Sequence, residues 1–176
     1  MRLLSFTSPL SVEQVIQCDS NSAGCNGGYT DSAFKYVEKA GGIETAADYP
    51  YSSYSGTTGR CVADKSKFVV SVNSYTKVVG ESNMGTYVQS TGPLSICVDA
   101  SSWSTYSAGV MSYCGTNVNH CVQAVGVDTS GVGGYWKVKN SWGTSWGESG
   151  FIRLAYGKNT CGITWDPLYS DVKFTD

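Results

Sequence analysis

The feature that most constrains the fold is a change of sequence pattern near Tyr75. Before this residue, short amphipathic stretches alternate with loops rich in glycine, asparagine and serine, which is typical of short helices joined by irregular segments. After it, short apolar runs are separated by glycine turns, which is typical of strands. The sequence therefore predicts an α+β fold, with helices and loops first and a mainly antiparallel sheet second.

Local signals predict the individual elements. A capping box at 11–14 predicts a helix that runs through Ile16. Thr30-Asp31 is expected to cap a second helix, which ends at Gly41. The remaining expected elements are a third short helix over 81–91 and strands over 94–99, 121–128, 135–140 and 151–155.

Composition excludes several functional classes. The formal net charge is −2 and no basic block occurs, so nucleic acid is not an expected partner. No apolar run approaches the roughly 18–20 residues of a membrane-spanning helix, so no membrane partner is expected. The chain has 7 cysteines but 1 histidine and no Cys-x-x-Cys pair, so we expect no metal and no cofactor. Disulfides in an oxidising compartment explain the cysteines better, and their odd number leaves at least one without an intramolecular partner.

The strongest chemical signal surrounds the single histidine, His120. It follows Asn119, and Asn140 opens an Asn-Ser-Trp-Gly-x-x-Trp-Gly-x-x-Gly motif further along the chain. An imidazole that is oriented by an amide and shielded by tryptophan is the base half of a Cys–His–Asn nucleophilic site. The matching cysteine nucleophile, in its usual sequence context, is not found among these residues.

Several further motifs occur in one order along nearly the whole chain, and in this order they resemble papain-like cysteine peptidases, the group of plant papain and the lysosomal cathepsins. They are Leu10-Ser11-x-Glu13-Gln14-x3-Cys18-Asp19, Gly24-Cys25-Asn26-Gly27-Gly28-Tyr29, Tyr49-Pro50-Tyr51, Gly92-Pro93-Leu94-Ser95, Asn119-His120, the Asn140 motif, Gly150-Phe151-Ile152-Arg153 and Cys161-Gly162-Ile163. Each motif is weak alone, but the ordered set is specific.

The resemblance implies a papain-like α+β fold of two subdomains with a cleft between them. Residues 1–75 would form the helical left subdomain, residues 76–168 the antiparallel, barrel-like right subdomain, and residues 169–176 a crossover back to the left. The family's nucleophile lies in a Cys-Gly-[Ser/Ala]-Cys-[Trp/Tyr] segment, about 130–150 residues before its histidine. His120 lies too near Met1 for that, so we expect the central helix and nucleophile to be missing and the chain alone to be inactive.

The resemblance also assigns roles to residues. His120 would be the general base and acid, Asn140 would fix its orientation, and Trp142 would shield their hydrogen bond from water. Gly27 and Gly28 would let an extended substrate pair with the backbone.

The cysteines match the family in part. By resemblance, Cys18–Cys61 and Cys114–Cys161 are disulfides, and Cys25 is a free thiol. Cys97 and Cys121 are additional, and they form either a third bridge or two small buried thiols.

The resemblance maps the S2 specificity pocket onto a wall formed by Thr30, Cys97, Val118 and Cys121, with Asp166 at its floor. A carboxylate there would accept basic as well as apolar substrate side chains, with the basic ones gaining as pH rises through the titration of Asp166. The alternative is that Asp166 points into solvent or caps the turn at Pro167.

Three functional hypotheses follow. The first is a papain-like cysteine endopeptidase acting on polypeptides, in a lysosomal or vacuolar compartment or outside the cell. The second is a non-catalytic pseudopeptidase that binds peptides or protein partners. The third is a chain that assembles with a separate N-terminal chain carrying the nucleophile.

Overall fold

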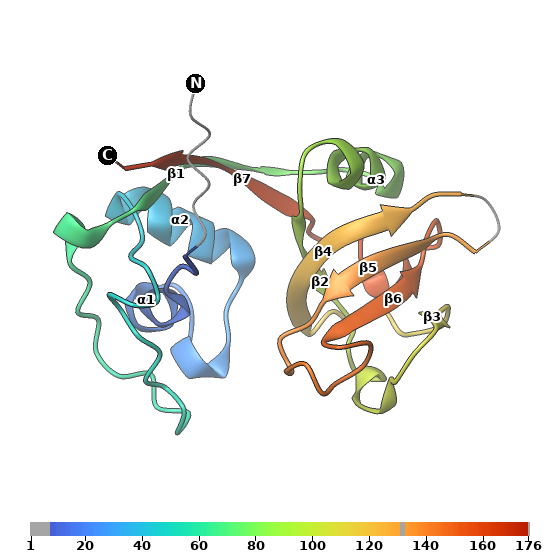
Figure 1. Ribbon diagram of the computed structural model, residues 1–176, viewed down its shortest axis with the longest axis horizontal. Helices are drawn as coiled ribbons and strands as arrows, with labels where there is room; N and C mark the ends of the chain where they lie inside the picture. The colour runs from blue at the N-terminus through green and yellow to red at the C-terminus, as the bar shows by residue number, and fades with distance from the viewer. Residues whose placement is uncertain (1–7, 131–132, 176) are drawn as a thin grey trace. The chain divides into compact units, whose positions relative to one another are not determined.

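The computed structural model describes residues 8–130 and 133–175, which divide into two compact units (Figure 1). The first unit holds the described residues up to Tyr75 together with those from Ser170 onward. The second unit is continuous and holds Thr76–Tyr169. The change of sequence pattern near Tyr75 thus coincides with the point where the chain leaves the first unit.

The first unit is built on two short helices, α1 (Val12–Cys18) and α2 (Thr30–Ala40). Ser11 caps α1, because its Oγ accepts a hydrogen bond from the backbone N–H of Gln14 at 2.9 Å. The reciprocal half of the predicted capping box does not form. The side chain of Gln14 instead accepts a hydrogen bond from the backbone N–H of Glu44 at 2.8 Å, which ties α1 to a distant segment. The helix ends at Cys18, two residues beyond the predicted end at Ile16.

The predicted cap of α2 is wrong. Tyr29 occupies the N-cap position without a side-chain hydrogen bond, and Thr30 and Asp31 already lie in the first turn. Asp31 still suits that place, because a negative side chain is favourable at a helix N-terminus. Gly41 ends the helix as predicted, since its φ of 91° is a left-handed conformation that glycine adopts without strain. The buried face of this unit consists of Val37, Ile43, Val70 and Val72.

The strands form a sheet whose order is β1-β7-β2-β4-β5-β6-β3 (Figure 1). Their bounds are β1 Val70–Lys77, β2 Leu94–Val98, β3 Val110–Met111, β4 His120–Asp128, β5 Tyr135–Lys139, β6 Phe151–Ala155 and β7 Leu168–Phe174. The four predicted strands are confirmed as β2, β4, β5 and β6. The sheet is mixed rather than purely antiparallel, because β3 pairs with β6 in parallel.

The core of the second unit gathers buried side chains of the strands, of α3 (Glu81–Ser90) and of two loop segments, and α3 contacts β4 (Figure 1). Strand β5 shows how the sequence directs the packing: Trp136 and Val138 are buried, whereas Lys137 and Lys139 face solvent. The other fully buried side chains here include Met84, Leu94, Ile96, Val98, Trp103, Ile152, Leu154 and Ile163. Each large apolar side chain buried in this way contributes roughly 1.5–3 kcal/mol.

The remaining elements are short 3-10 helices at Gly24–Asn26, Lys65–Lys67, Trp103–Thr105 and Thr160–Gly162. Among the described residues, the helices are all too short or too polar to cross a membrane.

Candidate active site

The structure brings His120 and Asn140 together at the ends of two paired strands. His120 is the first residue of β4, and Asn140 directly follows β5, which runs antiparallel to β4. His120 Nε2 lies 2.9 Å from Asn140 Oδ1. Asn140 is 8% exposed, and its backbone N–H is held by the carbonyl of Gly150 at 2.9 Å. His120 and Asn140 are therefore within hydrogen-bond distance, as the expected role of Asn140 in orienting the imidazole requires.

The backbone of Ser141 decides which way round the Asn140 amide lies. Its N–H, which can only donate, lies 2.8 Å from Oδ1, so this atom must be the oxygen of the amide. The same oxygen then accepts from His120, which puts the proton of the neutral imidazole on Nε2. His120 Nδ1 is left as the acceptor, which is the form that a general base requires.

The other amide atom, Asn140 Nδ2, is buried without a hydrogen-bond partner among the described residues. A buried unsatisfied donor is costly, on the order of 1–3 kcal/mol. The amide therefore keeps its orientation through its oxygen alone, where two donors, from His120 and Ser141, converge.

Two tryptophans contact the imidazole, and a third packs against them. Trp142 stacks on His120, with ring centroids 5.3 Å apart and an interplanar angle of 27°. Trp103 is fully buried and meets His120 edge-on at 6.2 Å. Trp146 stacks on Trp103 at 6.0 Å and donates its indole N–H to the Trp103 carbonyl at 3.1 Å. Trp142 is 42% exposed, so it covers the imidazole from the solvent side, while Trp103 supports it from the core.

Trp103 was missed by the sequence analysis. It lies in a short serine-rich segment, residues 101–105, which has no periodic pattern. The one signal that could have indicated its burial is the presence of a tryptophan in such a polar segment. The loop is fixed by Asp99, whose carboxylate accepts the N–H groups of Ser101 and Asn117, each at 3.0 Å. Hydrogen bonds from Ser101 lower the pKa of Asp99.

A disulfide crosses the sheet next to the histidine. Cys97 on β2 lies opposite Cys121 on β4 in the antiparallel register, one residue from the pair of Val98 and His120, and the two cysteines are bonded. Of the two open alternatives for this pair, the structure has the bridge. A second disulfide joins Cys114 to Cys161, and Cys161 Sγ accepts the Trp103 indole N–H at 3.5 Å.

Asp166, the predicted floor residue of the pocket, forms an ion pair with Lys77. Its Oδ1 lies 2.8 Å from Lys77 Nζ, and Lys77 also donates to the Trp165 carbonyl at 2.8 Å. Val118, a predicted wall residue, lies against the backbone of Gly162: a Cβ added to this glycine would be 3.2 Å from Val118 Cγ2.

The first unit holds the remaining predicted residues. Gly27 and Gly28 are exposed, and the φ of 103° at Gly27 is one that residues with a side chain rarely adopt. A Cβ at Gly28 would collide with the side chain of Ser22. Thr30 begins α2, and its Oγ1 is buried without a partner among the described residues. The free thiol of Cys25 is half-buried in the 3-10 turn before these glycines.

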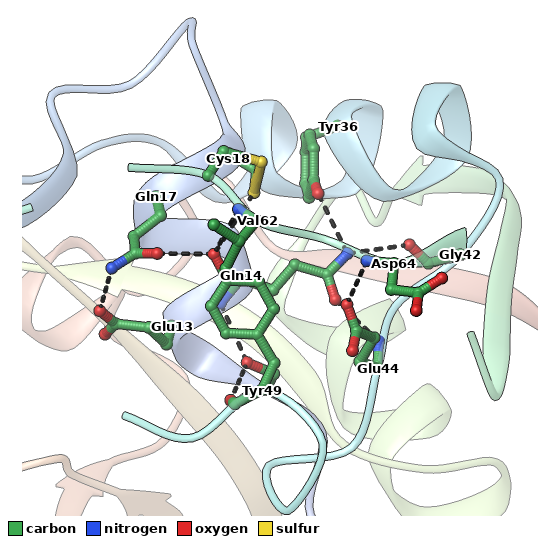
Figure 2. The surroundings of a disulfide bond; sticks show 12 residues. Glu13, Gln14, Gln17, Cys18, Tyr36, Gly42, Glu44, Tyr49, Val62 and Asp64 are labelled. Atoms are coloured by element: carbon green, nitrogen blue, oxygen red, sulfur yellow. Dashed lines mark hydrogen bonds between the residues drawn. A yellow bond between two sulfur atoms is a disulfide. The ribbon is translucent and has the colours of Figure 1, made fainter. Parts of the chain in front are cut away.

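Figure 2 shows the surroundings of Cys18, which is bonded to Cys61. The hydroxyl of Tyr49 donates to Gln17 Oε1 at 2.6 Å and accepts the N–H of Val62 at 3.0 Å. Through Tyr49, these bonds link α1 to the backbone at Val62, next to Cys61. The first unit is therefore cross-linked by a buried polar network as well as by its disulfide.

Glu13 is a buried carboxylate in the same network. Its Oε1 accepts hydrogen bonds from Gln17, Ser52 and Ser53 at 2.6–2.8 Å. Burial opposes the charged form, but the bonds from Ser53 and Ser52 outweigh it and lower the pKa of Glu13. Among the described residues, no cluster of three or more histidine, cysteine, aspartate or glutamate side chains could hold a metal ion.

Comparison with known proteins identifies the relatives of this chain. The family described as papain family cysteine protease matches residues 5–170. The viral cathepsin of Adoxophyes honmai nucleopolyhedrovirus is 41% identical over 157 residues, covering 88% of this chain and 46% of the viral protein. Cysteine proteinase A of Leishmania mexicana is 37% identical over 168 residues, covering 93% of this chain and 47% of the relative. The chain thus spans about half the length of the curated relatives it matches.

A solved structure gives the same result for the fold. The bromelain protease of Ananas comosus, in complex with the E64 inhibitor, superimposes with a TM-score of 0.83 at 35% identity, covering 96% of this chain and 80% of bromelain. Digestive procathepsin L2 of Tenebrio molitor superimposes with a TM-score of 0.87 at 34% identity, covering 94% of this chain and 54% of the beetle protein.

Proposed function

Because this chain belongs to the papain family of cysteine proteases, we propose that it forms the base-bearing part of a cysteine peptidase that hydrolyses polypeptides. The observation that carries the proposal is the hydrogen bond between His120 Nε2 and Asn140 Oδ1, with the amide oriented by Ser141. This arrangement leaves His120 Nδ1 available to take a proton from a thiol.

In the proposed reaction, the nucleophilic thiol gives its proton to His120 Nδ1, which yields a thiolate and an imidazolium. The thiolate attacks the carbonyl carbon of the peptide, and the C–N bond breaks as the imidazolium returns the proton to the leaving amine. Water then attacks the resulting thioester while His120 takes its proton, the C–S bond breaks, and the carboxylic acid product leaves as the thiol is restored with the proton from His120. Asn140 stabilises the imidazolium and keeps the ring in one orientation, and Trp142 limits the access of water to their hydrogen bond.

The thiol is proposed to come from residues other than these 176. Six of the 7 cysteines are used in three disulfides, and the seventh, Cys25, stands in the motif Gly24-Cys25-Asn26-Gly27-Gly28, which is not the family's nucleophile motif. The Cys-Gly-[Ser/Ala]-Cys motif does not occur in the sequence. We therefore expect this chain to be inactive alone and active when a nucleophile-bearing segment completes it, either in one chain or as a separate chain.

The proposed substrate contacts follow from the family. Gly27 and Gly28 would offer backbone groups to an extended peptide, since neither has a side chain that would keep the peptide away. The pocket for the second residue upstream of cleavage would use Cys97, Cys121 and Val118 as its wall and Asp166 as its floor. Three disulfides favour a lysosomal, vacuolar or extracellular location, where thiols are oxidised.

The test is hydrolysis of a fluorogenic dipeptide by the purified chain, alone and joined to the nucleophile segment of a papain-family enzyme. We expect no turnover by the chain alone. The joined protein should turn over substrate, react with an epoxide thiol inhibitor, and lose activity in His120→Ala. Cys25→Ser is the control, and it should leave that activity unchanged.

The outcomes separate the hypotheses. Turnover by the chain alone that Cys25→Ser abolishes would show that Cys25 is the nucleophile and would refute the need for a further segment. A joined protein that binds the peptide but never hydrolyses it would favour a non-catalytic peptide-binding protein instead.

A further inference from the structure

The topology of the second unit aligns three of its side chains in one row. Ser95 on β2 pairs with Leu168, the first residue of β7, and Asp166 lies two residues before Leu168; the same register, continued by two residues beyond the strand, leads from Asp166 to Cys97. Cys97 in turn lies directly opposite Cys121 on β4. Directly opposed residues of neighbouring strands share a sheet face, so Cys97 and Cys121 lie on one face, and the continued register assigns Asp166 to it as well. The row is next to the pair of Val98 and His120.

The charge of this row is set by a residue outside it. Lys77, the last residue of β1, places its ammonium 2.8 Å from Asp166 Oδ1 and donates to the Trp165 carbonyl, also at 2.8 Å. The ammonium further lies 6.0 Å from the centroid of the Trp165 ring. Trp165 and Asp166, two neighbouring residues just before β7, thus both contact the ammonium. Lys77 is therefore held against the carboxylate by more than one contact.

This pairing changes what the row offers to a substrate. A free carboxylate beside two half-cystines would attract a basic side chain. A carboxylate already bound to an ammonium offers no net charge, and a basic side chain would have to displace Lys77, exchanging one ion pair for another. Specificity is a difference between affinities, and this exchange contributes little difference.

We propose that Lys77 is a specificity-determining residue: it neutralises Asp166, so that this pocket does not favour basic side chains over uncharged ones of the same shape. The proposal rests on the proposed function, because it takes the row beside His120 as part of the substrate site. It replaces the dual acceptance that Asp166 alone would give.

The decisive comparison uses two peptide substrates that differ only in arginine or citrulline at the second position upstream of cleavage. Citrulline has nearly the shape of arginine without its charge, so the ratio of their kcat/KM values isolates charge recognition. The ratio is measured for the completed enzyme, for Lys77→Met, for Asp166→Asn and for the double variant. Lys77→Arg keeps the charge, and Lys158→Met removes an exposed charge elsewhere in the same unit.

We expect a ratio near unity for the unmodified enzyme, for Lys77→Arg and for Lys158→Met. Lys77→Met should raise the ratio roughly tenfold, because the exposed carboxylate can then pair with arginine. Adding Asp166→Asn to Lys77→Met should remove that gain. Asp166→Asn alone should lower the ratio, because it leaves Lys77 unpaired to repel arginine.

A ratio that Lys77→Met does not raise, in an active enzyme, overturns the proposal for Lys77. If no variant changes the ratio, the row is not a substrate pocket, although peptidase activity stands. If the completed protein has no turnover, the proposed activity fails, and calorimetric affinities of the two peptides for the same variants supply the ratio. An arginine preference that is absent in the unmodified protein and appears in Lys77→Met would still support the role of Lys77 in peptide binding.

Discussion

The ion pair of Glu148 and Arg153 should make the stability of the second unit depend on pH. The Glu148 carboxylate accepts hydrogen bonds from Arg153 Nε at 2.9 Å and Nη2 at 2.6 Å, and from the N–H of Gly109 at 3.0 Å. It lies at the end of the loop that begins with Asn140. Glu148→Gln keeps the shape and an acceptor for Gly109 but removes the charge that faces Arg153.

The structure gives the magnitude. Hydrogen bonds from Arg153 lower the pKa of Glu148 from its ordinary value of 4.5 to about 2, against the opposing effect of burial. At about 1.4 kcal/mol per unit this corresponds to about 3 kcal/mol. The side chains of Arg153 and Glu148 are 34% and 26% exposed, so solvent screening reduces the value, and we expect about 1–3 kcal/mol at pH 7. Because the folded-state pKa is lowered, this stability is present above pH 4.5 and is lost as pH falls towards 2.

The assay is urea denaturation of the wild type and Glu148→Gln at pH 7 and pH 3. All 5 tryptophans lie within Thr76–Tyr169, so their fluorescence reports on the unit that contains the pair. Asp31→Asn is the control, because it breaks the exposed helical pair with Lys35 in the first unit and should therefore leave the fluorescence transition of the second unit unchanged at both pH values. A difference between wild type and Glu148→Gln that is the same at pH 7 and pH 3 would refute the reasoning.

Three further predictions concern the site and the cysteines. In the completed enzyme, Asn140→Ala should lower kcat about 100-fold with little change in KM, because His120 loses the bond that fixes its ring; steady-state kinetics would contradict this if KM rose and kcat did not fall. Without reductant, iodoacetamide should alkylate Cys25 alone, so intact-mass analysis should find one added group per chain, and a second group would contradict the disulfide assignment. Trp103→Ala should destabilise the second unit by about 3–5 kcal/mol in urea denaturation, and a loss below about 1 kcal/mol would show that its burial was misjudged.

Much of the fold could be predicted from local sequence patterns. The helices and the strands β2, β4, β5 and β6 were found because their signals lie within a few residues: the Ser11 cap of α1, the glycine stop of α2 and the apolar runs of the strands. β1, β3 and β7 were missed. β7 combines Ser170, Asp171 and Lys173 with few apolar residues, β1 becomes polar after Val72, and β3 is only two residues long. Their place in the sheet depends on pairing between distant parts of the chain, which a local pattern does not contain.

The site divides in the same way. The approach of His120 to Asn140 could be predicted, because both residues stand in short motifs with a specific chemistry. The role of Trp103 and the proposed role of Lys77 could not be predicted, because each depends on a contact with a residue far away in the sequence. Lys77 in particular lies at the polar end of β1, and nothing in the local sequence indicates that its ammonium forms an ion pair with Asp166.

The groups that orient the base all belong to one unit. His120, Asn140, Ser141, Trp103 and Trp142 lie between Thr76 and Tyr169, and each orienting contact is made within this range. The tautomer and orientation of His120 therefore do not depend on the first unit or on a nucleophile. Under the proposed function, a thiol that reaches His120 Nδ1 would meet a proton acceptor that is already positioned and that cannot turn without breaking the bond to Asn140 and the stacking with Trp142.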